Sequence, residues 1–97
     1  MNYTVKWLPE AEGTYALVLE YLEQNWASRE IAKFIDRTDE VIRNLTENPK
    51  QYIYSKKKNA FRVVVTRQVS LYYRIKSTEI ELLIFWDPRQ DPKNLNL

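Results

Sequence analysis

Side chains that can bind phosphate or carboxylate groups are concentrated in the second half of the chain. An arginine guanidinium can hold either group through two parallel hydrogen bonds, and a lysine ammonium attracts both as a point charge. An aromatic ring among them adds a platform on which a base or a peptide could stack. We predict a groove that suits RNA, DNA or an acidic peptide equally well. Its candidate residues are Lys56, Lys57 and Lys58 at the lip, and Arg62, Arg67, Tyr72, Arg74 and Arg89.

The side chains that most often transfer protons or bind metals are missing from the sequence. The chain has no histidine and no cysteine, which removes the commonest metal ligand, the usual proton-transfer group near neutral pH and any disulfide. Glu79 and Glu81 lie two residues apart, and we interpret them as solvent-facing charges at a sheet edge rather than as an acid and base pair. A lysine could replace histidine only with a depressed pKa. We therefore expect no metal and no cofactor.

Charge is divided unevenly along the chain. Residues 1 to 48 carry five basic and nine acidic side chains, whereas residues 49 to 97 carry ten basic and four acidic ones. No acidic residue occurs between Lys50 and Lys76. Such asymmetry is typical of a protein with a polyanionic or acidic partner, although a solvated surface facing an acidic helical half would show it too.

Length and composition predict one domain spanning residues 1–97. The sequence is 44% hydrophobic and includes three tryptophans, which is enough material for a core. The amino terminus lacks the apolar run of a signal peptide, and no segment approaches the roughly 18 apolar residues of a membrane span. We expect a cytoplasmic protein with no membrane partner.

The first half of the chain predicts a strand and two helices that position the basic segment. Alternating polarity indicates a strand over residues 2 to 7, and Pro9 is typical of a helix start. The second helix would begin at Ser28, acting as its N-cap, and end near Glu47. A short connection makes the two helices an antiparallel hairpin. The predicted apolar stripe of the first helix comprises Leu8, Ala11, Tyr15, Val18, Leu22 and Trp26, widened by Leu17, Leu19 and Tyr21.

The second half of the chain predicts a loop over residues 50 to 59 and then three strands. Their short links permit only antiparallel neighbours. Alternation places Arg62, Tyr72 and Arg74 opposite the face that the helices cover. The residues predicted to share a face in the last strand are Ile80, Leu82, Ile84 and Trp86. The expected fold class is α+β, a two-layer sandwich with the N-terminal strand and helix hairpin packed on a three-stranded antiparallel meander.

The order of these elements, together with two motifs, resembles the RelE/ParE superfamily of bacterial toxins from type II toxin-antitoxin modules. The first motif is LYYRI, from Leu71 to Ile75, and the second is RQDP, from Arg89 to Pro92. The resemblance covers essentially the whole chain. It implies a cognate antitoxin whose disordered segment folds over the sheet and hairpin, covers the basic groove and forms a toxin-antitoxin hetero-oligomer.

The superfamily contains two classes of toxin. RelE-like members cleave mRNA on the ribosome, and the resemblance implies that the basic loop, Arg62 and Arg89 would supply charge to the transition state. The candidate catalytic residues of such an enzyme would be Lys56, Lys58, Arg62 and Arg89.

This sequence departs from the RelE-like pattern at its carboxyl end. Asp87 stands where many relatives have a histidine, and no tyrosine follows Arg89. ParE-like members instead inhibit DNA gyrase by protein contact and need no hydrolytic residues, so the absence of a general acid favours this class. A third alternative is a relative that binds its partner without being toxic.

Overall fold

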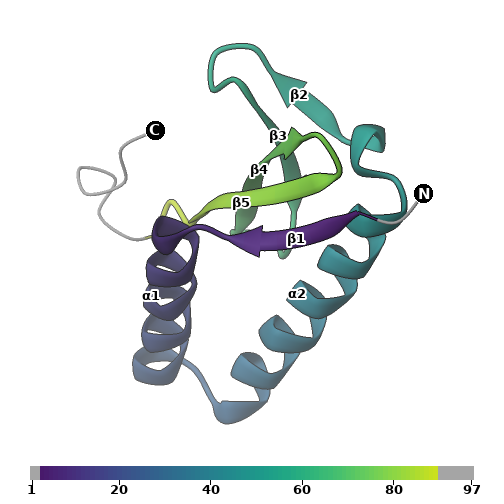
Figure 1. Cartoon of the computed structure of the whole chain (residues 1–97). Helices are drawn as coiled ribbons and strands as arrows, with labels where there is room; N and C mark the ends of the chain where they lie inside the picture. Colours follow the sequence, from purple (N-terminus) through teal and green to yellow (C-terminus); the bar gives the residue numbers. More distant parts are fainter. Residues whose placement is uncertain (1–2, 90–97) are drawn as a thin grey trace.

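A mixed five-stranded sheet and a helix hairpin make up the computed structural model, which describes residues 3 to 89 (Figure 1). The predicted Asn2 of the first strand and the Gln90 to Pro92 part of the carboxyl motif lie outside the described residues. The elements in order are β1 Thr4–Trp7, α1 Pro9–Asn25, α2 Ser28–Glu47, the 3-10 helix η1 Pro49–Gln51, β2 Ile53–Ser55, β3 Ala60–Val64, β4 Ser70–Lys76 and β5 Glu79–Trp86.

The strand order is β1-β5-β4-β3-β2. As predicted, β3, β4 and β5 form an antiparallel meander, and the fold is α+β. The N-terminal strand β1 lies parallel to β5 and pairs with its first half, from Glu79 to Leu82. Beyond Leu82, the neighbour of β5 is α1. The Oγ1 of Thr14 accepts a hydrogen bond of 2.9 Å from the backbone N–H of Phe85.

The helices form close to the predicted bounds, with a correction at the start of α2. Pro9 occupies the first turn of α1, where the positive end of the helix dipole stabilises the negative charges of Glu10 and Glu12. The N-cap of α2 is Ala27 rather than Ser28, which is the first helical residue, and no side-chain hydrogen bond caps the helix.

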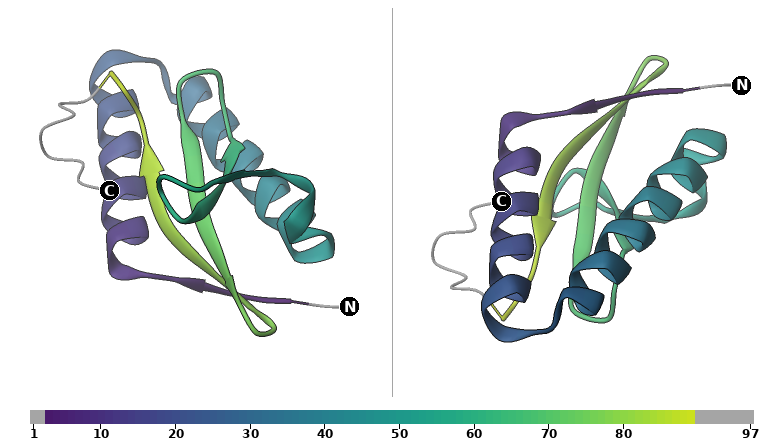
Figure 2. Two further views of the ribbon diagram at one scale, coloured as in Figure 1. Left: turned by 90° about the horizontal axis from the view of Figure 1, so that it is seen from above. Right: turned by 90° about the horizontal axis from the view of Figure 1, so that it is seen from below.

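One stripe of each helix is buried against the sheet. These residues are Ala11, Thr14, Val18 and Leu22 of α1, and Phe34, Thr38, Val41 and Leu45 of α2. Leu17 and Trp26 were predicted to belong to the α1 stripe, but both are exposed. Leu17 lies beside the buried stripe on the helix surface, whereas Trp26 follows the last residue of α1 and has an extended backbone. Figure 1 shows the helices diverging as a V, and both views in Figure 2 show β4 and β5 running between them.

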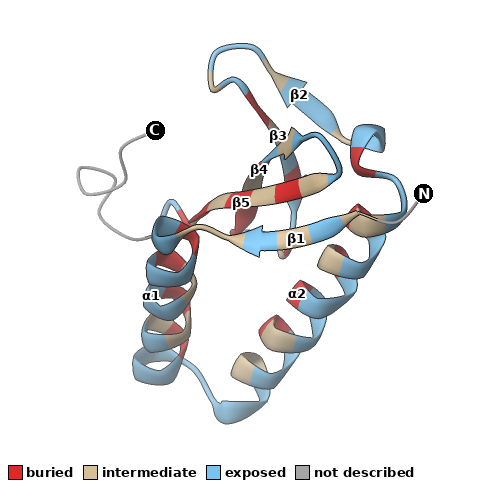
Figure 3. Ribbon diagram, in the orientation of Figure 1, coloured by how far each residue is buried: buried red, intermediate tan, exposed pale blue. Residues whose placement is uncertain are grey.

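The core lies between this hairpin and the inner face of the sheet. Aromatic rings dominate it near the start of α1, where Tyr15, Phe34 and Phe85 lie with centroids 5.1 to 6.5 Å apart. Figure 3 shows the buried positions along β3 to β5 and on the inward sides of both helices. Neither helix in the described part of the chain combines the length and apolarity needed to cross a membrane.

Two predictions about the second half of the chain are wrong. Residues 50 to 59 are not all loop, since Ile53–Ser55 form β2 and pair with β3. In β5, a bulge shifts the pairing, so that Tyr72 lies opposite Ile84 and the next residue, Tyr73, lies opposite Leu82. The extra residue, Leu83, reverses the alternation after it. Phe85 therefore points into the helix-covered core with Leu82, whereas Ile84 and Trp86 lie on the outer face.

Candidate functional site

The outer face of the sheet holds three of the predicted site residues. Arg62 of β3 and Tyr72 of β4 lie directly opposite each other, and Arg74 follows on the same face of β4. Both arginines are exposed and Tyr72 is half-buried. The Nε of Arg62 donates a hydrogen bond of 3.2 Å to the Oγ of Ser70, which directs its guanidinium toward the start of β4.

The lysine loop, residues 56 to 59, joins β2 to β3 at one end of this face. Lys56 and Lys57 are exposed and Lys58 is half-buried. Asn59 has a φ of 53°, a left-handed conformation that asparagine tolerates in tight turns. Its carbonyl oxygen accepts a hydrogen bond of 3.3 Å from the Nε of Arg74. The loop is therefore tied to Arg74, as a lip on one end of the predicted surface.

Arg67 lies away from the lysine loop. It sits in the turn between β3 and β4, at the opposite end of these strands, and is exposed. Because about five residues of β3 separate the two turns, Arg67 and the lysines bracket the outer face rather than form one cluster.

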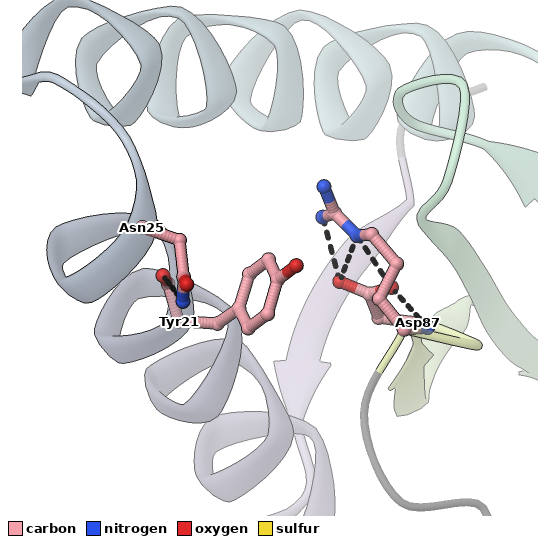
Figure 4. Close-up of polar contacts among 4 residues, drawn as sticks. Tyr21, Asn25 and Asp87 are labelled. Carbon is pink, nitrogen blue, oxygen red and sulfur yellow. Dashed lines mark hydrogen bonds and ion pairs between the residues drawn. The ribbon is translucent and has the colours of Figure 1, made fainter.

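Arg89 does not line the outer face. Its guanidinium contacts the carboxylate of Asp87 and the ring of Tyr21 in α1, and Figure 4 shows the Tyr21 ring directed toward Asp87. Its Nη2 and Nε donate to the two carboxylate oxygens of Asp87 at 2.7 to 3.2 Å, and its guanidinium carbon lies 4.6 Å from the centre of the Tyr21 ring. The hydrogen bonds to Asp87 raise the pKa of Arg89. We name this arrangement the Asp87–Arg89 clasp.

Burial explains why the clasp exists. The Asp87 side chain is fully buried, and an isolated buried carboxylate is costly unless it is paired and hydrogen-bonded. The backbone N–H of Arg89 adds a further bond of 2.9 Å to the same carboxylate. Arg89 therefore does not lie beside Arg62, Tyr72 and Arg74, because its guanidinium is held against Asp87.

Acidic residues share the outer face with the basic ones. Glu81 lies directly opposite Arg74, and Glu79 lies opposite Lys76. The prediction that these glutamates lie at a sheet edge is wrong, since β1 covers that side of β5 and places Lys6 opposite Glu81. This end of the face carries mixed charge, which weakens the attraction of a phosphate to Arg74.

Sequence reasoning missed Trp86 as a site residue. The bulge at Leu83 turns it to the outer face, where it lies opposite Ser70, the residue that Arg62 contacts. Val64 lies on the other side of Ser70 in the same row. An alternation count cannot find Trp86, because four consecutive apolar residues, Leu82 to Phe85, conceal the bulge.

A cavity of about 230 Å³ opens at the tip of the helix hairpin, near Arg89. Its lining is Leu22, Trp26, Glu30, Lys33, Phe34, Thr66, Gln68, Val69 and Arg89. It is smaller than the usual range of about 300 to 1,000 Å³ for small-molecule sites and contains none of the outer-face residues. Within residues 3 to 89, no group of acidic side chains is arranged to hold a metal ion.

Comparison with solved structures identifies the fold. A chain from the chromosomal ParDE toxin-antitoxin system of P. aeruginosa superimposes with a TM-score of 0.75 and 17% identity, over 88% of this chain and 95% of that chain. A YoeB/ParE toxin from Agrobacterium tumefaciens gives 0.60 and 12%, over 87% and 97%. The YoeB dimer from Staphylococcus aureus gives 0.58 and 13%, over 87% and 94%. No protein-family model and no curated protein sequence matches the chain significantly. The chain thus has the RelE/ParE-type toxin fold.

Proposed function

We propose that this protein is the toxin of a toxin-antitoxin module and that it inhibits DNA gyrase by protein contact. The observation that carries the proposal is the match of nearly the whole chain to a ParDE chain, with a TM-score of 0.75. Its partners would be a cognate antitoxin, which neutralises it in a hetero-oligomer, and gyrase in the cytoplasm.

The chemistry of the outer face supports protein contact rather than RNA cleavage. Cleavage of RNA requires a group that takes a proton from the ribose hydroxyl and another that protonates the leaving oxygen. The chain has no histidine, Arg89 is held by Asp87, and Arg74 faces Glu81. The guanidinium of Arg62 remains, and its charge stabilises a transition state but does not transfer protons.

The test of gyrase inhibition uses purified gyrase and relaxed plasmid. The protein at saturating concentration should abolish supercoiling, and its induction in cells should stall replication and induce the DNA-damage response. Co-expression of an antitoxin encoded beside its gene should restore growth. Unchanged supercoiling at a saturating concentration of the protein would contradict the proposal. Normal growth under strong induction would instead favour a partner-binding protein without toxicity.

Ribosome-dependent mRNA cleavage is the second candidate, because Arg62 and Tyr72 lie opposite each other on an exposed face. A tyrosine hydroxyl beside a guanidinium can donate a proton. Toeprinting on translating ribosomes should then reveal cuts that Arg62→Ala and Tyr72→Phe both remove. Arg43→Ala is the matched control, since it removes one exposed positive charge from α2. The absence of cuts with the unaltered protein would exclude this activity.

A further inference from the structure

Two cross-strand rows on the outer face form a continuous surface around Arg62. The first row runs Ile53, Arg62, Tyr72 and Ile84 from β2 to β5, with Ile84 fully buried, and the second runs Val64, Ser70 and Trp86 from β3 to β5. We call Ile53, Arg62, Val64, Tyr72 and Trp86 the outer-face patch. Its members come from four strands. Trp86 belongs to it only because the bulge in β5 turns this side chain to the outer face.

Apolar side chains in this patch are unusually exposed. Ile53 is 69% and Val64 is 47% exposed, although both are large aliphatic residues in strands. Tyr72 and Trp86 are half-buried beside them. Neighbouring exposed apolar groups of this kind mark interaction sites in soluble proteins.

Arg62 is the single charge within the patch. Its Nε contacts Ser70, and within the described residues no hydrogen bond or ion pair occupies its two terminal nitrogens. Arg62 faces Ile53 and Tyr72 across its strand, whereas Arg74 and Lys76 at the other end of the face oppose Glu81 and Glu79. The patch therefore presents one uncompensated guanidinium surrounded by apolar and aromatic groups.

We propose that the outer-face patch is the docking surface for the protein target, which would insert an acidic side chain, flanked by apolar ones, against Arg62. This inference rests on the proposed function and names the surface that performs it. Tryptophan, tyrosine and arginine are the residues that most often dominate protein interfaces, and apolar neighbours exclude water around them. RNA would gain little from Ile53 and Val64, and its many phosphates would meet only one cation within the patch.

The experiment measures binding of the full chain to purified DNA gyrase, with Trp86→Ala and Arg62→Glu as test variants. Each should weaken the Kd at least about tenfold, as expected for central interface residues. Trp26→Ala is a matched control, because Trp26 is also exposed but lies at the tip of the helix hairpin. Arg43→Glu controls for the charge reversal, because Arg43 is exposed on α2. Both controls should stay within about twofold of the unaltered protein.

Thermal melts establish that each variant is folded. Val64→Glu, at an exposed position, takes the place of Trp86→Ala if that variant fails to fold. Binding of the unaltered protein to gyrase with no loss in the patch variants overturns the docking surface alone. No binding by the unaltered protein overturns the proposed function and the docking surface together. If labelled single-stranded RNA loses affinity for the patch variants while gyrase does not, the patch is a nucleic-acid surface and the inference is wrong.

Discussion

The buried carboxylate of Asp87 determines what Arg89 can do. Removing one partner of a buried ion pair costs about 3 to 5 kcal/mol, because the other charge is left unpaired. A loss of toxicity in Arg89→Ala would therefore report a folding defect before it reported a lost contact with a target. In contrast, Arg62 and Arg74 are exposed, so their replacement tests contacts directly.

Tyr73 provides a prediction about pH. Its buried hydroxyl donates a hydrogen bond of 2.5 Å to the carbonyl of Pro49, and burial, followed by the nearby Tyr52, raises its pKa above the ordinary value. The unfolded chain then loses this proton at lower pH than the folded chain. Stability should be intact below about pH 10 and fall above it, by up to roughly 1.4 kcal/mol per pH unit.

Urea denaturation at pH 7, 10 and 11 tests this prediction in the unaltered protein and in Tyr73→Phe. The variant should lose about 1 kcal/mol at pH 7 with its hydrogen bond, and its stability should fall less steeply above pH 10. Equal alkaline slopes in the two proteins would contradict the role assigned to Tyr73.

At the scale of elements, the sequence predicts the helices and strands whose apolar pattern extends over several residues. Both helices and the meander were predicted correctly, because their apolar stripes run over at least five residues. The three residues of β2 are too few to show a period, and its pairing depends on β3. The bulge in β5 depends on tertiary contacts, since either Ile84 or Phe85 could fill an inward position. Trp86 was missed as a result.

The contact between α1 and β5 leads to a prediction about the edge of the sheet. Where β1 ends, the Oγ1 of Thr14 accepts the Phe85 N–H, and it donates to the backbone of Glu10 at 2.8 Å. Thr14→Val keeps the shape but leaves a buried N–H unsatisfied, which should cost about 1 to 3 kcal/mol in urea denaturation. Thr46→Val is the control, since that hydroxyl bonds at the surface of α2, and it should change stability by less than about 0.5 kcal/mol. Equal stability of the two variants would exclude this role of Thr14.

At the scale of the whole molecule, charge is separated between the helical half and the sheet. The sequence predicted this separation from composition, but it could not place Glu79 and Glu81 opposite Lys76 and Arg74, because register is set by the folded sheet. The lysine loop is the part of the basic surface that lies at one end of the outer face, beyond Ile53 and Arg62 of the patch.

The position of the lysine loop predicts a role in association rate. Charges at the rim of an interface steer the partner and change the on-rate more than the off-rate. Replacing Lys56, Lys57 and Lys58 by alanine should slow association with gyrase several-fold at low salt, with little change in dissociation and a weaker dependence on ionic strength. Stopped-flow or surface-plasmon measurements at two salt concentrations give the association rate, the dissociation rate and their dependence on ionic strength.

A matched triple variant controls for net charge. Arg29, Lys33 and Arg43 are exposed on α2, so replacing them by alanine removes three positive charges from the helical half. If steering depends on where the charge lies, this control should slow association less than the loop variant does. If the loop instead supplied catalytic charge for mRNA cleavage, the loop variant would abolish toxicity outright while α2 variants kept it. Retained toxicity with slower gyrase association is the combination that the protein-contact mechanism requires.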